Sequence, residues 1–479
     1  WQYASRRKPE EATAARPMSR HWQFEARMSM TGANADRRVA VKPSQAPHVV
    51  VALHNAIAAA TGGSSAGKAD LPEAAAAAVA QCAKELVAAR GKSLVVCGLN
   101  EEGAQILVNS INSMLGNYGS TIDIRNASPF FRGNDAAMAQ LVKDLNAGKV
   151  GAILIAGANP AYTLPNAEEF KAGLKKAGIS VSFSSHADET ASLCNWIAPD
   201  HHWLESWGDH QAKAGAFALA QPTIRPLFDT RQWGQSLLKW SGVDSDWRSF
   251  VQTVCKGTMS APWEQSLHDG VYQGTTAAAE PTAFTADLGA AAQAALEATK
   301  GAGEWELELY TSEALASGIH ANNPWLQELP DPITKATWDN YVCIRPEDLS
   351  ALTGKSFKQL YIGQESPANV LKVTVNGVAM ELPAVLSPGQ APKTIAVALG
   401  YGRGANGERV GRAACLRNPD GSPAPVGQNA YPWTSLRGNF INYEAVSATV
   451  EPTGKTYAIA LTQTQMTGME RGSIVKETT

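Results

Sequence analysis

The sequence lacks closely spaced cysteines. It contains six, but no two lie closer than 15 residues and none forms a C-x-x-C pair. Iron–sulfur clusters and structural zinc sites usually take ligands from such pairs, so the spacing argues against both kinds of site. The scatter is typical of buried free thiols rather than of a disulfide framework, and it does not decide the redox compartment. The six are Cys82, Cys97, Cys194, Cys255, Cys343 and Cys415.

Charged residues and long apolar runs are also scarce. Charged residues make up 18% of the chain and the formal net charge is −3, which argues against nucleic acid as a partner. No apolar run approaches the ~20 residues that would span a bilayer. The 479 residues, 44% of them hydrophobic, are enough for two to four domains. Because the chain begins at Trp1 rather than Met, we expect the true N-terminus and any targeting signal to lie upstream.

Motifs of hydrolases and of phosphate-binding loops are missing as well. There is no H-E-x-x-H sequence, and no Ser/His/Asp or Cys/His nucleophile pattern stands out. Residues 62–68 resemble a phosphate-binding loop only loosely. Ala69 stands where a Ser or Thr would hold magnesium, and no apolar strand precedes the loop. We therefore assign no catalytic residue in this chain.

The densest polar cluster lies at residues 200–210 and has two interpretations. Imidazole and carboxylate groups could form a metal site, or they could belong to a polar loop that follows a short strand at 196–199. Adjacent histidines point to opposite faces of a strand and diverge on a helix, so they rarely share a metal. We therefore expect no metal site. The cluster consists of Asp200, His201, His202, Glu205, Asp209 and His210.

The most informative stretch that is present runs from residue 150 to 166 and reads VGAILIAGANPAYTLPN. Its apolar run lacks alternation, which predicts a parallel strand buried on both faces. The run stops at Gly157, and ligands of open α/β sheets lie beyond such strand ends. Gly157 would let a ligand approach the backbone, and Asn159 offers a donor and acceptors. The alternative interpretation is an ordinary loop built from turn residues.

A second polar group follows the strand predicted at 179–183. Asp188, Glu189 and Thr190 stand at its carboxyl end, on the same edge of the sheet as Asn159. The triplet could cap the next helix or could bond a nucleotide, and capping is the commoner use of such residues.

The order of elements predicts four regions. Residues 1–48 read as an irregular basic arm, with nine Lys or Arg against four acids. Residues 49–335 alternate strands and helices, which favours a Rossmann-like α/β domain with a doubly wound parallel sheet and an exposed excursion at about 270–303. Residues 336–464 read as a compact β-barrel, and 465–479 as a tail. The strands expected in the α/β domain lie at 93–98, 121–125, 152–156 and 179–183.

The barrel is predicted from short strands joined by Gly/Pro loops, which begin near residue 336. The dipeptide Asn376-Gly377 is a strong signal for a two-residue hairpin between two of them. The expected strands lie at 341–345, 370–375, 378–382, 394–399 and 457–462.

Together these pieces resemble the molybdopterin oxidoreductases that bind a bis-pterin guanine dinucleotide. The resemblance is carried by GANPA at 157–161, by the segment 188–209, by YVCIRPEDLSALTG at 341–354 and by VGQNAYP at 426–432. It implies a double-psi-like barrel after the α/β sheet. It also implies a nucleotide cradle, where sheet and barrel meet, built from Gly157, Asn159, Asp188, Thr190 and Asn429. The family's iron–sulfur domain and molybdenum ligand would lie upstream of this chain.

A narrower resemblance is to the large subunit of bacterial alternative complex III, through TGANADRRVAVKPSQ at 31–45 and QMTGMERGSIVKET at 465–478. That resemblance implies a vestigial, empty cradle and no cofactor in this chain. It places iron–sulfur clusters in a domain after the tail and haem c in partner subunits. The implied partners are a multihaem cytochrome c and polysulfide-reductase-type, quinol-binding membrane subunits. The implied location is the periplasmic side of the inner membrane, where the arm and the tail would run along neighbouring subunits.

Three functions remain open from the sequence. The first is a cofactor-free structural module of a complex that oxidises menaquinol. The second is a fragment of an active molybdenum oxidoreductase similar to polysulfide or tetrathionate reductases. The third is an independent small-molecule binding protein that reuses the α/β sheet.

Overall fold

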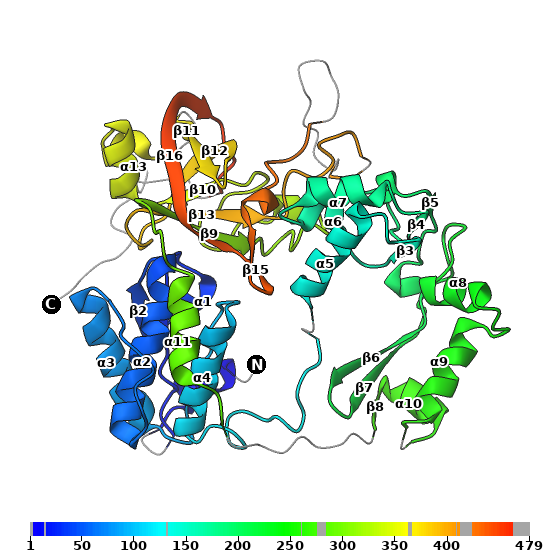
Figure 1. Ribbon diagram of the computed structural model, residues 1–479, viewed down its shortest axis with the longest axis horizontal. Helices are drawn as coiled ribbons and strands as arrows, with labels where there is room; N and C mark the ends of the chain where they lie inside the picture. Colours follow the sequence, from blue (N-terminus) through cyan, green and yellow to red (C-terminus); the bar gives the residue numbers. More distant parts are fainter. Residues whose placement is uncertain are drawn as a thin grey trace.

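The computed structural model describes residues 3–13, 16–130, 133–259, 261–274, 284–362, 366–408, 410–411 and 424–462. A closed barrel forms the centre, with a helical unit beneath one end and an α/β unit beside the other (Figure 1). A small antiparallel sheet with three helices extends from the α/β unit. Among the described residues, no helix is both long enough and apolar enough to cross a bilayer.

The helical unit packs α2 (Ala46–Thr61), α3 (Glu73–Ala88), α4 (Glu102–Met114) and α11 (Leu288–Glu297) together (Figure 1). In α4, apolar residues recur at helical spacing and are buried. Glu101 caps this helix by accepting bonds from its first backbone amides.

The prediction of an exposed excursion at 270–303 is wrong where α11 lies, because this helix is part of the core. Ala291 and Ala292 of α11 are buried against α4. The two helices approach so closely that a Cβ on Gly103 would lie 2.1 Å from the carbonyl oxygen of Ala291. An Ala-rich sequence was read as an exposed loop, although small side chains also permit close helix packing.

The predicted irregular arm is also wrong in its second half. Strand β1 (Trp22–Glu25) pairs in parallel with β2 (Arg37–Ala40), and α1 (Met30–Ala33) lies between them in the chain. Basic residues of this arm form ion pairs with acids of the same chain. These pairs are Arg38–Glu25 at 2.5 Å, Lys42–Glu306 at 3.6 Å and Arg27–Glu308 at 3.8 Å. These cations are therefore paired with acids of the same chain, whereas the sequence analysis expected the arm to run along neighbouring subunits.

The α/β unit contains a parallel sheet in the order β3 (Ala152–Ile155), β4 (Ile179–Ser182), β5 (Trp196–Ile197). Helices α5 (Asp135–Asn146), α6 (Pro160–Thr163) and α7 (Ala167–Leu174) belong to the same unit (Figure 1). In the described residues, this sheet is therefore smaller than the predicted doubly wound sheet. Residues 93–98 and 121–125 are not strands, because 93–98 lies against α4 in the helical unit, away from this sheet.

The antiparallel unit was not anticipated from the sequence. Strands β6 (Gly208–Lys213), β7 (Ala216–Ala220) and β8 (Val271–Gln273) form its sheet. Helices α8 (Trp233–Trp240), α9 (Trp247–Lys256) and α10 (Trp263–Asp269) lie beside it (Figure 1). Its small core centres on Val251, Cys255, Trp263 and Tyr272.

The barrel closes in the order β10-β12-β11-β16-β9-β13. Asn376 and Gly377 both have positive φ, at 51° and 79°, so the predicted hairpin between β11 and β12 is confirmed. The barrel starts earlier than the predicted boundary near 335, because β9 pairs with β13 and β16. The strand predicted at 457–462 is wrong, since β16 ends at Tyr457. The double-psi crossing stays a prediction. The barrel strands are β9 (Trp305–Thr311), β10 (Val342–Ile344), β11 (Ala368–Val375), β12 (Val378–Leu386), β13 (Thr394–Leu399) and β16 (Glu444–Tyr457).

A hairpin joins the barrel to both neighbouring units. It consists of β14 (Ser435–Arg437) and β15 (Phe440–Asn442). The carbonyl of Ile441 accepts a bond from Asn100 of the helical unit at 3.0 Å. The backbone amide of Ile441 donates to the carboxylate of Asp135 in the α/β unit at 2.8 Å. The hairpin therefore links the helical unit and the α/β unit to the barrel.

The remaining short helices and turns connect these elements. They are α12 (Pro324–Glu328), α13 (Pro346–Thr353) and α14 (Phe357–Leu360), with the 3-10 turns η1 (Ala4–Arg6), η2 (Pro9–Glu11), η3 (Pro43–Gln45), η4 (Ala191–Leu193), η5 (Trp203–Glu205) and η6 (Tyr431–Trp433).

Candidate functional site

The predicted cradle begins where β3 ends. Gly157 has a φ of +63°, and a Cβ there would meet open space, so the turn rather than a close contact favours glycine. Asn159 precedes α6 but does not cap it with its side chain. Its amide nitrogen donates to Glu189 at 2.7 Å, and its amide oxygen accepts from the hydroxyl of Thr190 at 2.6 Å. The strand end is therefore bonded to the loop after β4.

Asp188 and Thr190 are engaged in the same loop. The Asp188 carboxylate accepts from the backbone amides of Thr190 at 3.1 Å and Ala191 at 2.7 Å, and from the hydroxyl of Ser184 at 2.9 Å. The hydroxyl of Thr190 accepts from the amide of Ala161 at 3.0 Å. Asp188 therefore stabilises the turn η4, which is the capping interpretation of this triplet.

Asn429 reaches this region from the barrel side. Its amide nitrogen donates to the carbonyl of Tyr162 in α6 at 3.2 Å, and its amide oxygen accepts from the amide of Tyr431 at 3.0 Å. Gly402 makes the approach possible, because a Cβ there would lie 2.2 Å from the backbone nitrogen of Asn429. The structure thus brings Asn159, Asp188 and Thr190 into direct contact and links Asn429 to them through Tyr162.

A buried ion pair that the sequence did not reveal holds the same junction. Arg403 contacts both carboxylate oxygens of Glu189 at 2.8–3.1 Å. The side chains of Arg403 and Glu189 are only 9% and 7% exposed. The guanidinium also donates to the carbonyl of Gly318 at 2.5 Å and lies 4.7 Å from the ring centre of Tyr162. Glu189 was visible in the sequence beside Asp188, but its partner is 214 residues away.

The protonation state of this pair follows from its surroundings. Burial raises the pKa of Glu189, but the hydrogen bonds and positive charge of Arg403 outweigh burial and hold that pKa below its usual value. The amide of Gly404 also donates to the carboxylate at 2.9 Å. Glu189 is therefore ionised at neutral pH, and its charge is compensated within the protein.

The cradle residues do not fit a guanine dinucleotide in this arrangement. The side-chain polar atoms of Asn159, Asp188, Thr190 and Asn429 are bonded to protein groups rather than directed at a free space. A nucleotide would have to displace these bonds, each of which contributes about 0.5–1.5 kcal/mol. The cluster can join the α/β sheet to the barrel, but it offers little for recognition of a base or ribose.

The histidine cluster is likewise engaged in its own loop. Asp200 and Glu205 accept bonds from backbone amides, and His202 caps the turn η5. The ring of His201 bonds the hydroxyl of Thr230 at 2.6 Å. In the part of the chain that the structure describes, no group of three or more His, Cys, Asp or Glu side chains is arranged to hold a metal ion.

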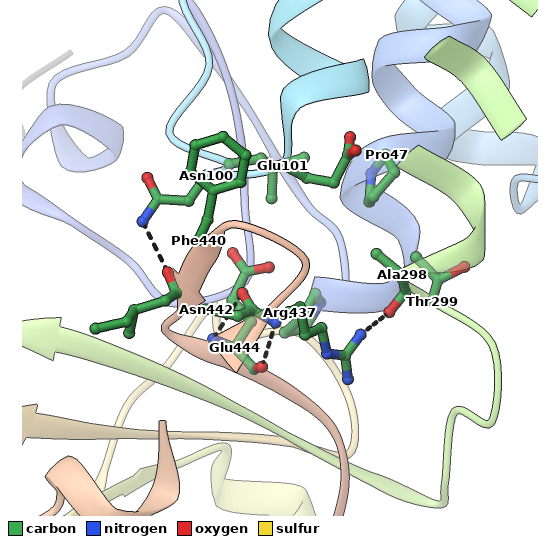
Figure 2. Close-up of a pocket in the computed structure, with 12 residues that line it drawn as sticks. Pro47, Asn100, Glu101, Ala298, Thr299, Arg437, Phe440, Asn442 and Glu444 are labelled. Atoms are coloured by element: carbon green, nitrogen blue, oxygen red, sulfur yellow. Dashed lines mark hydrogen bonds between the residues drawn. The ribbon is translucent and has the colours of Figure 1, made fainter. Parts of the chain in front are cut away.

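The larger concave feature lies elsewhere, between the helical unit and the barrel. A cavity of about 790 Å³ is lined by β1, by residues 94–100 and by Glu308 and Glu444 of the barrel. A smaller pocket of about 50 Å³ adjoins it and shares Asn100 and Glu444 with it. Figure 2 shows Asn100 and Glu101 on one side of this pocket, with Arg437 and Glu444 opposite.

Three glutamates of the barrel line or border this cavity, and two of them are paired. Glu306 accepts from the hydroxyl of Ser44 at 2.7 Å as well as pairing with Lys42, while Glu308 pairs with Arg27. Glu444 has no side-chain hydrogen bond or ion pair with any described residue. Burial, and then the negative charges of Glu308 and Glu306, raise the pKa of Glu444 to about 8. Sequence analysis missed this site, although the alternation in WELELYT at 305–311 is a strand signal.

Glu444 predicts a specific dependence of stability on pH. Its pKa is raised in the folded state, so folding takes up a proton between pH 4.5 and 8 and the contribution is lost as pH rises through this window. The loss is at most about 1.4 kcal/mol per pH unit. The substitution E444Q removes this titrating group. The urea midpoint of the natural chain should therefore fall, relative to that of the variant, between pH 5 and pH 8. E328Q, at an exposed glutamate of α12, is the control, and a parallel response of E444Q and the natural chain would refute this assignment.

Comparisons with known proteins agree with this geometry at the level of the fold. The structure is similar to acetylene hydratase from Pelobacter acetylenicus, with a TM-score of 0.59 and 10% identity over 90% of this chain and 74% of that one. The fold is therefore similar to that of the molybdopterin oxidoreductases.

A sequence relative points in the same direction. Part of the chain is 38% identical, over 95 residues, to the molybdopterin-binding-like subunit of menaquinone reductase from Nitratidesulfovibrio vulgaris. The match spans 19% of this chain and 14% of that relative. No protein-family model matches the chain. The chain therefore matches only a small part of that relative's length, and the likeness to the solved structure concerns the fold alone.

Proposed function

We propose that the chain is a cofactor-free structural module of a membrane-associated respiratory complex that oxidises menaquinol. Its partners would be those of alternative complex III, namely a multihaem cytochrome c and quinol-binding membrane subunits, on the periplasmic side of the inner membrane. Iron–sulfur clusters would belong to a domain after residue 479 and haem c to the cytochrome. The barrel, with its double-psi-like connections, and the α/β unit would hold that iron–sulfur domain in place.

One observation carries the cofactor-free part of the proposal. The groups that the family resemblance assigns to the nucleotide bond one another and the barrel, and the buried Glu189–Arg403 pair closes the same junction. Such a junction stabilises the contact between two units, whereas a nucleotide site needs unsatisfied polar groups aimed at a cavity. The quinone-related part is supported by the likeness to a menaquinone reductase subunit.

The alternative is a fragment of an active molybdenum oxidoreductase. One observation favours it, namely the cavity of about 790 Å³ between the helical unit and the barrel, whose size lies in the range of cofactor sites. Changes in the cradle residues should affect turnover of a molybdenum oxidoreductase, whereas they should affect only assembly of a structural module.

The proposal predicts how a cradle variant behaves in the assembled complex. N159A removes the bonds to Glu189 and Thr190, which should weaken the junction and lower the yield of complex. Turnover of a menaquinol analogue, expressed per haem c in the purified complex, should stay within about twofold because the chemistry takes place in other subunits. N166A is the matched control, because Asn166 is half-buried before α7 and its side chain bonds Glu169 alone among the described residues.

Two results would contradict the proposal. One is a tenfold or larger fall in turnover per haem at unchanged yield. The other is a chain that purifies without haem c subunits and reduces or oxidises substrate alone.

A further inference from the structure

The segment 93–100, between α3 and α4, is an extended chain whose backbone groups are hydrogen-bonded along one edge. Its side chains alternate between half-buried at odd positions and exposed at even ones, the period of a strand. The carbonyls of its odd-numbered residues accept bonds from three side chains. These bonds run from Thr121 Oγ1 to Ser93 O (2.5 Å), from Asn112 Nδ2 to Val95 O (2.8 Å), and from Gln105 Nε2 to Cys97 O (3.0 Å) and Leu99 O (2.6 Å).

The opposite edge of this segment is open. In an extended chain the N–H and C=O of one residue point to the same edge, and successive residues alternate. The backbone groups of Leu94, Val96 and Gly98 therefore point away from α4, and they have no hydrogen-bond partner among the described residues. Leu94 and Val96 are 52% and 80% exposed. A row of unpaired amides beside exposed apolar side chains is a template for another strand.

The space beside this edge suits an extended peptide. Leu94 and Val96 line the cavity of about 790 Å³, and so do Trp22 and Phe24 of β1. Among the described strands, β1 pairs only with β2, and its residues line the cavity. A strand placed here could bond the open amides, while its alternate side chains would meet apolar walls.

The unpaired carboxyl group of Glu444 at one end of the cavity indicates that the strand should carry a basic residue. Glu444 lines the same cavity as Cys97 and Asn100. Its carboxylate is the unpaired one of the three barrel glutamates, since Glu306 and Glu308 have cationic partners. The only cation acting on it in the described residues is Arg437, whose guanidinium is bonded to the carbonyl of Ala298 (Figure 2). A lysine or arginine brought by the strand would complete the pair.

We propose that the edge of residues 93–100 receives an extended strand from a partner protein, with alternating apolar residues and a basic residue that pairs with Glu444. Binding would add backbone hydrogen bonds to Leu94, Val96 and Gly98 and would fill the cavity between the helical unit and the barrel. A helix could not meet the open amides, because its own backbone groups are paired internally.

The test uses synthetic probes on the full chain. Two acetylated octapeptide amides alternate valine with threonine, and each carries one lysine, at the first position or at the last, to allow for either strand direction. Binding is measured by calorimetry, and amide exchange of residues 93–100 by mass spectrometry. One of the two peptides should slow exchange at Leu94, Val96 and Gly98 at least tenfold.

Matched variants separate edge pairing from other causes. V96P removes an amide that no described group uses and blocks the edge, so it should weaken peptide binding at least tenfold while the chain stays folded. V96T keeps the amide and should bind normally. V95P removes the amide that donates to Asn112 and should destabilise the chain itself. E444Q should weaken binding of the lysine peptide, but not of the same peptide with threonine in place of the lysine.

Several outcomes would overturn the proposal. These are unchanged binding by V96P, peptide binding that leaves the three amides unprotected, and failure of both peptides to bind. Protection that rises with the concentration of the chain alone would assign the edge to a second copy instead.

Discussion

Replacing Arg403 by methionine should lower the free energy of unfolding of the barrel by about 3–5 kcal/mol. The substitution leaves the Glu189 carboxylate buried with one negative charge and no cation, although Asn159 and Gly404 still donate to it. It also removes the bond to Gly318 and the contact with Tyr162. Native-state hydrogen exchange of barrel amides is the suitable measurement, because a chain with several units need not unfold in one step.

A double variant is the control for this prediction. With both R403M and E189M, no unpaired charge remains, so the loss should be much smaller than the sum of the two single losses. The remaining cost would come from the donors of Asn159 and Gly404 that lose an acceptor. If R403M alone costs less than about 1 kcal/mol, the pair does not hold the junction, and the account of the cradle as a structural joint is wrong.

Truncating Trp433 should have an effect of similar size in the barrel core. Trp433 is 1% exposed, and its indole nitrogen donates to the carbonyl of Val378 at 3.0 Å. W433A would leave a cavity and an unpaired carbonyl, which together should cost about 3–5 kcal/mol. Exchange of the amides in β11 and β12 reports the loss directly.

Trp325 offers the matched control, because it is 83% exposed. W325A should change stability by no more than about 0.5 kcal/mol. Equal losses for the two tryptophan variants would show that Trp433 does not anchor the barrel core. This would contradict the burial of Trp433 beside β12.

Much of the barrel could be predicted from the sequence because its signals are local. The Asn376-Gly377 turn needs positive φ at two successive positions, which these residue types tolerate. The position of strand β3 was also readable from its apolar run, but the predicted burial on both faces is wrong, since Ala152 and Leu154 are exposed. The antiparallel unit had no comparable signal, since its strands are short and the periodicity of its sequence is weak.

Other features could not be predicted because their partners are distant in the chain. Glu306 and Glu308 of β9 are neutralised by Lys42 and Arg27, more than 260 residues away, so neither a buried strand nor a folded arm was evident. The run at 93–98 has the composition of a strand, yet no described strand lies beside it. Composition predicts that a segment can pair, whereas the fold decides whether a partner is present.

The candidate site shows the same division. Strand-end placement and the family resemblance brought Asn159, Asp188, Thr190 and Asn429 to one junction, as the structure does. They could not show whether the side chains face a ligand or one another. That depends on Arg403, whose loop reaches the cluster only through the tertiary fold. The tail at 465–479 lies outside the described residues, so its expected contact with an iron–sulfur domain stays a prediction.

The most direct test of a cofactor-free module is chemical analysis of the complex purified through a tag on this chain. Molybdenum is measured by mass spectrometry, and pterin by the fluorescence of its oxidised form after release from the protein, both per mole of chain. The account predicts less than about 0.05 mole of either, with haem c and iron at the levels of the partner subunits. One mole of molybdenum and two of pterin per mole of chain would contradict it and would make the chain part of a working molybdenum enzyme.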